Sequence, residues 1–172
     1  EEGVQVKRPQ IGVLIEVPAA VYQARLLAKE ADFMAVGSND LTQYLLAVDR
    51  NNPRVADLYQ EVHPAVIMAL REVARAVHAE EKPLGICGEL AGTPAGAILL
   101  MAMGYHVLSM NATHLLRVKW VIRNIKRSDA RRMLARVLRM DTAEEVAPFL
   151  NKEMVRLGLS KVMPARSATQ TP

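Results

Sequence analysis

The chain has 172 residues, of which 51% are hydrophobic and 23% charged, and this composition supports one packed domain and excludes a disordered polymer. Aromatic residues make up only 4% of it, which favours packed helices over an all-β sandwich. No apolar run approaches the roughly 18 residues of a membrane-spanning helix, and the single cysteine cannot form an internal disulfide. These features predict a cytoplasmic protein without a membrane segment. Because the chain starts with neither an initiator Met nor a signal peptide, we expect it to begin inside a longer protein.

The predicted elements alternate between strand and helix. Four apolar runs closed by Gly or polar residues predict buried strands at 11–16, 33–37, 84–87 and 107–110. Helix formers and helix-opening prolines predict helices at 19–29, 41–48, 64–79, 94–103 and 114–125. Such alternation predicts an α/β fold with parallel strands and right-handed crossovers.

The C-terminal part is predicted to contain only helices, over residues 128–160. Ser128 and Thr142 are candidate N-caps, and Thr142 with Glu145 fits a capping box. Residues 161–172 are rich in Pro, Ser, Thr and Ala, and we expect a disordered tail there.

The net charge of +4 is unevenly distributed along the chain. Residues 1–112 carry nine Lys and Arg against thirteen Asp and Glu, whereas residues 113–172 carry thirteen against five. The basic stretch 117–139 is interleaved with apolar residues at helical spacing. Because no recognition motif accompanies the charge, we expect a solvent-exposed or partner-facing surface there and do not expect nucleic acid as a partner.

Three of the predicted strands end in reactive side chains. Glu16 closes the first strand, Asn39 and Asp40 follow the second, and Cys87 with Glu89 closes the third. The carboxyl ends of parallel strands are where α/β barrels place their catalytic groups. This pattern predicts an enzyme.

Glu16 and Asp40 are candidate Mg²⁺ ligands, because adjacent parallel strands lie about 5 Å apart and Mg²⁺ often takes one or two carboxylates. The alternative is a helix N-cap for Asp40 and a structural ion pair for Glu16. Asn39 and Arg50 could hold an anionic substrate; the alternative for Arg50 is a solvated helix end.

Cys87 is a candidate proton donor, because flanking glycines let a substrate approach it closely. The alternative is an inert buried cysteine, with Glu89 either orienting the thiol or capping the next helix. The four histidines share no metal-ligand spacing, and we expect structural roles for all of them: His63, His78, His106 and His114.

A family resemblance covers about residues 9–125 nearly without gaps. The chain resembles the C-terminal, phosphoenolpyruvate-binding domain of enzyme I of the bacterial phosphotransferase system. The matching strings are IGVLIEVPAAV, FMAVGSNDLTQYLLAVDRNNPRVADLY, HPAVIMALREVARAVHAEEKPLGICGELAG and VLSMNATHLLR. Pyruvate phosphate dikinase and phosphoenolpyruvate synthase share the SNDLTQ and CGE elements, but QYLLAVDRNN is more similar to enzyme I.

The resemblance implies a fold and a set of site residues. Residues 1–127 would form the C-terminal half, strands five to eight, of a (β/α)₈ TIM barrel. Glu16 and Asp40 would bind Mg²⁺; Asn39, Asp40 and Arg50 would bind phosphoenolpyruvate; and Cys87 would protonate the enolate to give pyruvate.

The resemblance also implies partners that lie outside these residues. The phosphoryl group would pass to a histidine on a separate domain of the same enzyme and then to a phosphocarrier protein, and the family member would be a homodimer. Because a half barrel exposes two sheet edges and its inner face, we expect self-association or a covering remainder of the protein.

Two other functions stay open from the sequence. One is the dikinase or synthase branch, which makes phosphoenolpyruvate from pyruvate and ATP. The other is a module that uses the basic helices to bind nucleic acid or a protein partner.

Overall fold

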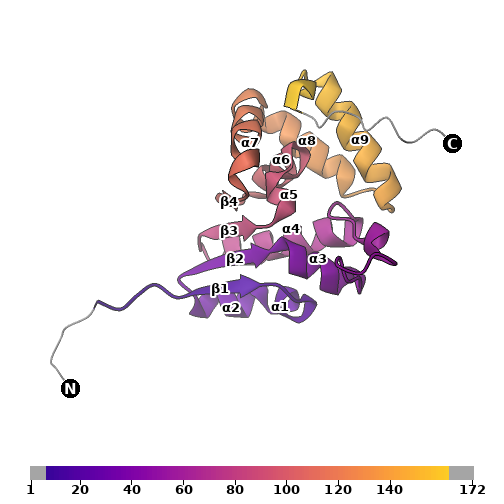
Figure 1. The fold of residues 1–172 in the computed structure, drawn as a ribbon. Coiled ribbons are helices and arrows are strands. Elements are labelled where there is room, and N and C mark those ends of the chain that lie inside the picture. The colour runs from indigo at the N-terminus through magenta and orange to yellow at the C-terminus, as the bar shows by residue number, and fades with distance from the viewer. Residues whose placement is uncertain (1–6, 163–172) are drawn as a thin grey trace.

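A computed structural model describes residues 7–162, in which four parallel strands form one sheet (Figure 1). The strands are β1 (Gly12–Ile15), β2 (Phe33–Gly37), β3 (Leu84–Cys87) and β4 (Val107–Ser109), and they are hydrogen-bonded in the order β1-β2-β3-β4. Each strand is parallel to its neighbour. The α/β alternation predicted from the sequence is therefore confirmed.

Helices connect and follow these strands. They are α1 (Pro18–Tyr22), α2 (Ala24–Glu30), α3 (Ser38–Leu46), α4 (Pro64–Ala79), α5 (Glu89–Gly92), α6 (Pro94–Met103), α7 (Ala112–Asn124), α8 (Arg127–Val137) and α9 (Ala143–Arg156). Two short 3₁₀ helices, η1 (Ala56–Leu58) and η2 (Ser160–Val162), complete the described elements. In this part of the chain, no helix combines the length and apolar character needed to cross a membrane.

The helix starts follow local sequence signals. Pro18, Pro64 and Pro94 each occupy the first position of a helix. Proline has no backbone N–H, and at this position an N–H would have no partner within the helix. The capping box of α9 is present, with Thr142 and Glu145 as predicted. Ser128 was the wrong cap for α8, which starts one residue earlier, at Arg127.

Two other boundaries differ from the sequence prediction. The helix expected over 19–29 is divided at Gln23 into α1 and α2. The helix expected to start at residue 41 starts at Ser38, immediately after β2. Asn39 and Asp40 consequently lie in the first turn of α3 rather than in a loop.

One face of the sheet is buried against helices. Ile15, Met34, Val36, Leu84 and Ile86 point into a core that is shared with α4 and α6. The strand residues between them face the other way and are less covered. Parallel sheets are normally covered on both faces, so this sheet has one open face.

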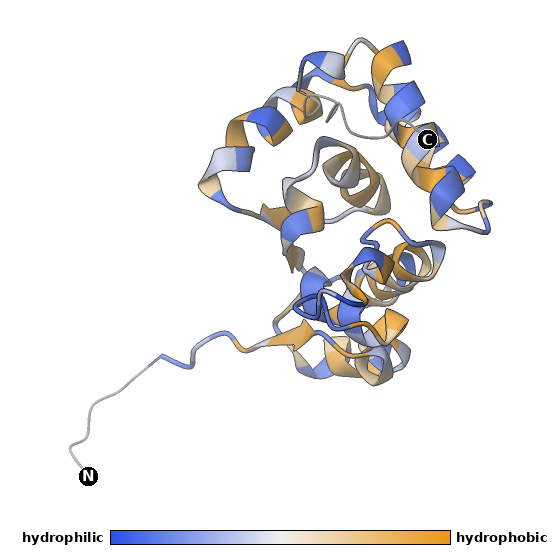
Figure 2. Ribbon diagram, turned by 45° about the vertical axis from the view of Figure 1, so that its right-hand side comes forward, coloured by the Kyte–Doolittle hydropathy of each residue, from blue (hydrophilic) through white to orange (hydrophobic). Residues whose placement is uncertain are grey.

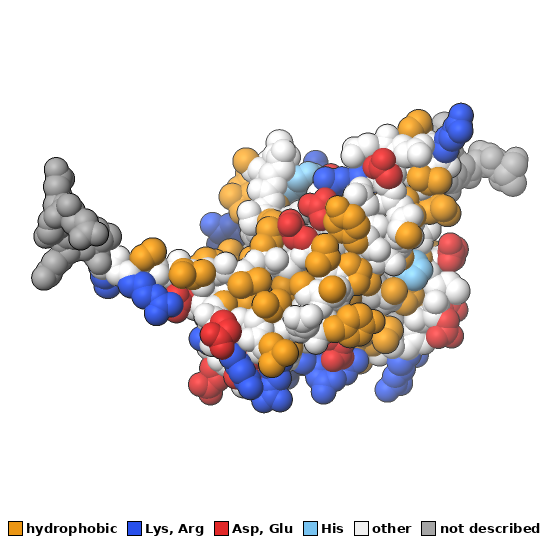
Figure 3. Space-filling model, turned by 90° about the horizontal axis from the view of Figure 1, so that it is seen from below, with side chains coloured by type: hydrophobic (Ala, Val, Ile, Leu, Met, Phe, Trp, Pro, Cys, Tyr) orange, Lys and Arg blue, Asp and Glu red, His pale blue; other side chains and the backbone are white. Residues whose placement is uncertain are grey.

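The open face and the β1 edge expose apolar side chains. Leu14 is 47% exposed and Val107 60% exposed, although both belong to strands. From below, on the side of β1, α1 and α2, hydrophobic side chains gather across the middle of the molecule (Figure 3). Tyr22 on α1 and Leu26 on α2 are among the exposed ones.

The C-terminal helices pack onto the same core. Met133 of α8 and Val146, Leu150 and Met154 of α9 are buried in it. Hydrophobic and hydrophilic residues alternate along these amphipathic helices (Figure 2). The basic side chains of α7 and α8 are exposed, as expected. The division at residue 127/128 stays a prediction, and of the expected disordered tail, residues 163–172 lie outside the described part.

Candidate functional site

The carboxyl ends of the strands bring the predicted site residues to one edge of the sheet. Cys87 is in register with Gly37 of β2 on one side and with Ser109 of β4 on the other. Glu16 directly follows Ile15, which is paired with Val36. Strand register therefore aligns Glu16, Gly37, Cys87 and Ser109 in one row.

The side chain of Glu16 lies over Gly37. A β-carbon added to Gly37 would be 2.7 Å from Cγ of Glu16 and closer still to its Oε1. The absence of a side chain at Gly37 thus creates the space in which the Glu16 carboxylate rests. Gly37 is the N-cap residue of α3, and Asp40 lies in the first turn of that helix.

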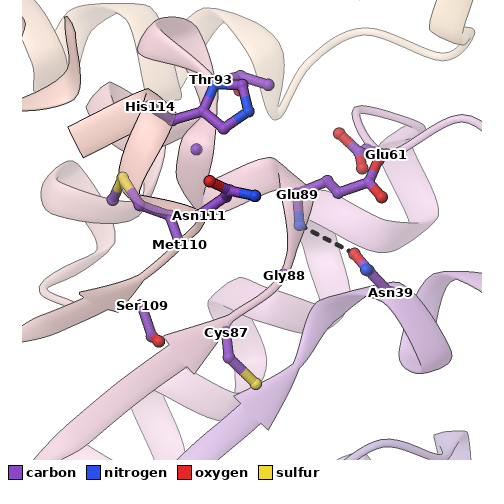
Figure 4. Close-up of a pocket in the computed structure, with 11 residues that line it drawn as sticks. Asn39, Glu61, Cys87, Gly88, Glu89, Thr93, Ser109, Met110, Asn111 and His114 are labelled. Atoms are coloured by element: carbon purple, nitrogen blue, oxygen red, sulfur yellow. Dashed lines mark hydrogen bonds between the residues drawn. The ribbon is translucent and has the colours of Figure 1, made fainter. Parts of the chain in front are cut away.

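Asn39 joins the end of β2 to the end of β3. Its side-chain Oδ1 accepts a hydrogen bond of 3.0 Å from the backbone N–H of Glu89 (Figure 4). Because Oδ1 is engaged, the amide nitrogen of Asn39 is the group left to donate to an anionic ligand. Gly88 has a φ of +130°, and a β-carbon there would be 2.7 Å from Asn39 Oδ1. Only glycine allows this approach.

The Cys87 side chain lies at the carboxyl end of β3, is partly buried, and directs its sulfur toward β2 (Figure 4). Its Sγ lies 3.6 Å from the carbonyl oxygen of Val36, to which the S–H can donate. Ser38 Oγ donates to the Cys87 carbonyl oxygen at 3.0 Å. Ser38 therefore holds the backbone that carries the thiol, and the Val36 carbonyl oxygen orients the thiol itself.

Arg50 is brought to Asp40 by the turn that ends α3. Ala47 has a left-handed conformation, with φ of 53°, and the Arg50 backbone N–H donates to Gln43 Oε1 at 3.3 Å. The Arg50 guanidinium lies 4.0 Å from Asp40 Oδ1, with the two side chains 35% and 45% exposed. This partial exposure leaves both groups accessible to a ligand.

Part of this set borders a hollow of about 550 Å³ (Figure 4), whereas Glu16, Asp40 and Arg50 are not among the residues that line it. Asn39, Cys87, Gly88 and Glu89 line it as the strand ends predicted. The structure adds lining residues that the sequence reasoning did not propose: Glu61, Gly92, Thr93, Ser109, Met110, Asn111 and His114.

Some of these additions carried a sequence signal. Ser109 ends an apolar strand and Asn111 follows it, so the rule that selected Glu16 and Asn39 would have selected them if applied to β4. His114 was expected to have a structural role, yet it lines the hollow from α7. Glu61 follows no strand, and only the tertiary structure places it there.

Glu61 is the side chain with the most unusual electrostatics in this region. Burial, and next the charge of nearby Glu89, raise the pKa of its carboxyl to about 7 against the opposing effect of Arg50. Oε1 of Glu61 is buried and, among the described residues, has no hydrogen-bond partner. Glu61 and Glu89 also border a second hollow of about 430 Å³ that extends toward α9.

The donor set fits Mg²⁺ better than a transition metal. Within residues 7–162 no three His, Cys, Asp or Glu side chains come together as a metal cluster. Mg²⁺ does not need such a cluster, because it often binds one or two carboxylates and takes its other ligands from water and substrate oxygens. Glu16, whose carboxylate lies over Gly37, and Asp40, in the first turn of α3, are the candidate carboxylates for such an ion.

Similarity to known proteins is extensive. Residues 1–127 match the family described as PEP-utilising enzyme, PEP-binding domain. The chain is 42% identical over 157 residues to the Escherichia coli K12 protein named "Phosphoenolpyruvate-dependent phosphotransferase system", which is 91% of this chain and 21% of that protein.

Two further relatives carry the name "Phosphoenolpyruvate-protein phosphotransferase". The Haemophilus influenzae protein is 42% identical over 151 residues, which is 88% of this chain and 26% of the relative. The Geobacillus stearothermophilus protein is 41% identical over 143 residues, which is 83% and 25%. The chain thus spans about a quarter of the length of these relatives.

Proposed function

Because this chain belongs to the family of PEP-binding domains of PEP-utilising enzymes, we propose that it forms the phosphoenolpyruvate- and Mg²⁺-binding part of a phosphoenolpyruvate-protein phosphotransferase. The single observation that supports the proposal is that Glu16, Asn39 and Cys87 all lie at the carboxyl ends of adjacent parallel strands. Relatives at 41–42% identity are named phosphoenolpyruvate-protein phosphotransferase, which favours this activity over the dikinase or synthase branch.

The sheet is proposed to be strands five to eight of a (β/α)₈ barrel. Its four parallel strands follow each other in space in sequence order, as consecutive strands of a barrel do. The open face, on which Leu14 is 47% exposed, would be the barrel interior, to be covered by four earlier strands. The catalytic groups at the carboxyl edge agree with the usual active-site position in such barrels.

Substrate binding is assigned to Arg50 and Asn39. The Arg50 guanidinium can pair with phosphoryl or carboxylate oxygens, and the free amide N–H groups of Asn39 can donate to the same anion. Glu16 and Asp40 would hold Mg²⁺, which supplies positive charge that stabilises the phosphoryl oxygens and the enolate oxygen.

Proton transfer is assigned to Cys87. When the phosphorus–oxygen bond breaks and the phosphoryl group passes to a histidine nitrogen on another domain, enolpyruvate is left. The Cys87 thiol then gives its proton to the methylene carbon of enolpyruvate, which forms the methyl group of pyruvate. The resulting thiolate regains a proton from solvent, so the cycle is balanced.

Isotope transfer tests this function. The full-length protein that contains this chain, incubated with Mg²⁺ and phosphoenolpyruvate labelled in its phosphoryl group, is expected to release pyruvate and to carry label on a histidine outside these residues. The 172-residue chain alone is expected to take up no label. Label on His63, His78, His106 or His114 contradicts the proposal, as does a full-length protein that forms no pyruvate.

The assembly and location are also part of the proposal. A phosphocarrier protein is the expected receiver of the phosphoryl group, and a cytoplasmic homodimer is the expected form of the enzyme. The apolar side chains exposed around β1 and α1 are compatible with a covering partner or with the earlier barrel strands.

A further inference from the structure

Glu61 occupies a wall shared by two hollows beside the proposed substrate site. It lies just after η1 and lines both the hollow that contains Cys87 and the one that extends to α9. Its Oε1 is buried and, in the described part of the chain, accepts no hydrogen bond. An ionised carboxylate in this position would lack compensation for lost hydration, so the geometry itself favours a carboxyl that retains a proton.

The charged groups that face Glu61 come from two directions. Glu89 lies on the α5 side, where the two carboxyl groups are drawn near each other (Figure 4). Arg50 approaches from the turn after α3 and is the only cation that acts on Glu61 among the described groups. The Tyr59 hydroxyl, which donates to the Asn39 carbonyl oxygen at 3.3 Å, interacts with all three.

The remaining neighbours of Glu61 are neutral or act elsewhere. Thr93 and Asn151 line the second hollow without charge. His114 borders the first hollow from α7. Glu144 and His63 interact with each other, and Glu144 also bonds the Gln60 side chain, so neither acts on the Glu61 carboxyl. The charge of Arg50 is therefore the main partner available to an ionised Glu61.

Arg50 also has a competing partner. Its guanidinium is at 4.0 Å from Asp40, which is the outer limit of an ion pair, and its side chain is 35% exposed. The guanidinium also bonds the Tyr59 hydroxyl, beside which it can turn toward Asp40, an incoming anion or Glu61. Which of them it meets depends on the charges that surround it.

We propose that Glu61 is a positioning residue for Arg50 and that the proton on its carboxyl decides whether Arg50 can bind the phosphoryl substrate. With the proton in place, Glu61 is neutral and leaves the guanidinium to the substrate and Asp40. Without it, Glu61 and Glu89 together present two negative charges that draw Arg50 away from the substrate. This inference rests on the proposed function and adds to it a control of substrate affinity by pH.

The direction of the pH effect follows from the protonation equilibrium. Burial, and next the charge of Glu89, raise the pKa of Glu61 from 4.5 to about 7. Below this pH the carboxyl is mostly neutral, and above it the carboxyl is mostly ionised. Affinity for phosphoenolpyruvate should accordingly weaken as the pH rises through neutrality.

Comparison of wild type with Glu61→Gln in the full-length protein tests the inference, because Gln resembles the protonated carboxyl at every pH. At about pH 6 we expect the two proteins to have equal KM values for phosphoenolpyruvate. At about pH 8 the wild-type KM should be about fivefold higher than that of the variant, because a partly exposed ion pair that competes with substrate has an effect of this size. The ratio of the two kcat values should stay constant. Dividing the wild-type KM by the variant KM at each pH removes the contribution of the substrate's own titration.

Two other variants sharpen the comparison. Glu89→Gln removes the charge that raises the pKa of Glu61, so the KM rise should move to lower pH. Glu72→Gln, which changes an exposed α4 carboxylate paired only with Arg75, should reproduce the wild-type profile. A Glu72→Gln profile that matches that of Glu61→Gln would contradict the inference.

A direct titration separates this inference from the proposed function. The carboxyl ¹³C resonance of Glu61, followed by NMR in the 172-residue chain, should titrate near neutral pH; titration at an ordinary glutamate value overturns the inference. If turnover is normal and the ratio of the wild-type KM to the Glu61→Gln KM does not change with pH, the proposed role of Glu61 is overturned and the proposed function is not. A full-length wild type that forms no pyruvate overturns the proposed function, and the inference with it.

Discussion

The carboxylate of Glu16 rests in the space that a side chain at Gly37 would occupy. A β-carbon on Gly37 would be 2.7 Å from Glu16 Cγ and 3.0 Å from Cδ, both shorter than ordinary van der Waals contacts. Glycine at the end of β2 therefore decides where a predicted Mg²⁺ ligand on the neighbouring strand can lie.

Gly37→Ala is expected to displace the Glu16 carboxylate and to raise the Mg²⁺ concentration that gives half-maximal pyruvate formation by roughly 10- to 100-fold, as loss of a supporting contact does at other metal sites. Gly85→Ala is the matched control, because a β-carbon there would be 3.6 Å from its nearest neighbour, Val107 Cβ. Equal Mg²⁺ dependence in the two variants would show that the cradle has no role.

Asp40→Ala should abolish Mg²⁺-dependent turnover, because it removes one of the two carboxylates assigned to the ion. Titration of pyruvate formation with Mg²⁺ measures the effect. Asp57→Ala, in the exposed η1 segment, should leave the titration unchanged. A wild-type rate for Asp40→Ala at limiting Mg²⁺ refutes the metal-ligand assignment.

Cys87→Ala is expected to separate phosphoryl transfer from protonation. Pyruvate formation should fall by roughly 10²- to 10⁴-fold, the usual effect of losing a general acid. Binding of Mg²⁺ and phosphoenolpyruvate should persist, because neither is assigned to the sulfur. Calorimetric affinity and pyruvate release, measured side by side, test this. An unchanged rate of pyruvate release would make Cys87 a packing residue.

Tyr105→Phe should lower the free energy of unfolding by about 1 kcal/mol, as expected for the loss of one buried hydrogen bond. The Tyr105 hydroxyl donates to the Leu70 carbonyl oxygen at 3.0 Å, and the residue is 6% exposed. Tyr22→Phe is the control, because Tyr22 is 90% exposed and its hydroxyl can bond water. Urea denaturation of the 172-residue chain distinguishes them, and equal midpoints would contradict the expectation.

Glu61 should make the stability of the chain depend on pH. The pKa of its carboxyl is raised in the folded state to about 7 from 4.5, so between these values the unfolded state releases a proton that the folded state retains. Wild type should therefore lose stability relative to Glu61→Gln as the pH rises through this window. Above the window, the difference between their free energies of unfolding should stay constant. Thermal unfolding at several pH values measures this, and parallel curves for the two proteins would rule it out.

The local features of this protein can be predicted from its sequence alone. Apolar runs predicted all four strands to within one or two residues, because the solvent exclusion that a buried strand needs is visible in its own composition. The opening prolines and the Thr142–Glu145 capping box marked helix starts, since these effects act within one turn. Glu16, Asn39 and Cys87 were selected because each follows such a run.

Which distant residues come together depends on the packing of the whole fold. Glu61 and Glu89 share a wall although 28 positions separate their numbers, and neither periodicity nor motif spacing encodes that proximity. The cradle of Glu16 on Gly37 depends on the parallel register of β1 and β2. Local propensity reports the backbone state of a segment, whereas register and helix packing result from the burial of the whole core. For this reason the candidate ligands could be predicted from the sequence, whereas the position of the Glu61 carboxyl could not.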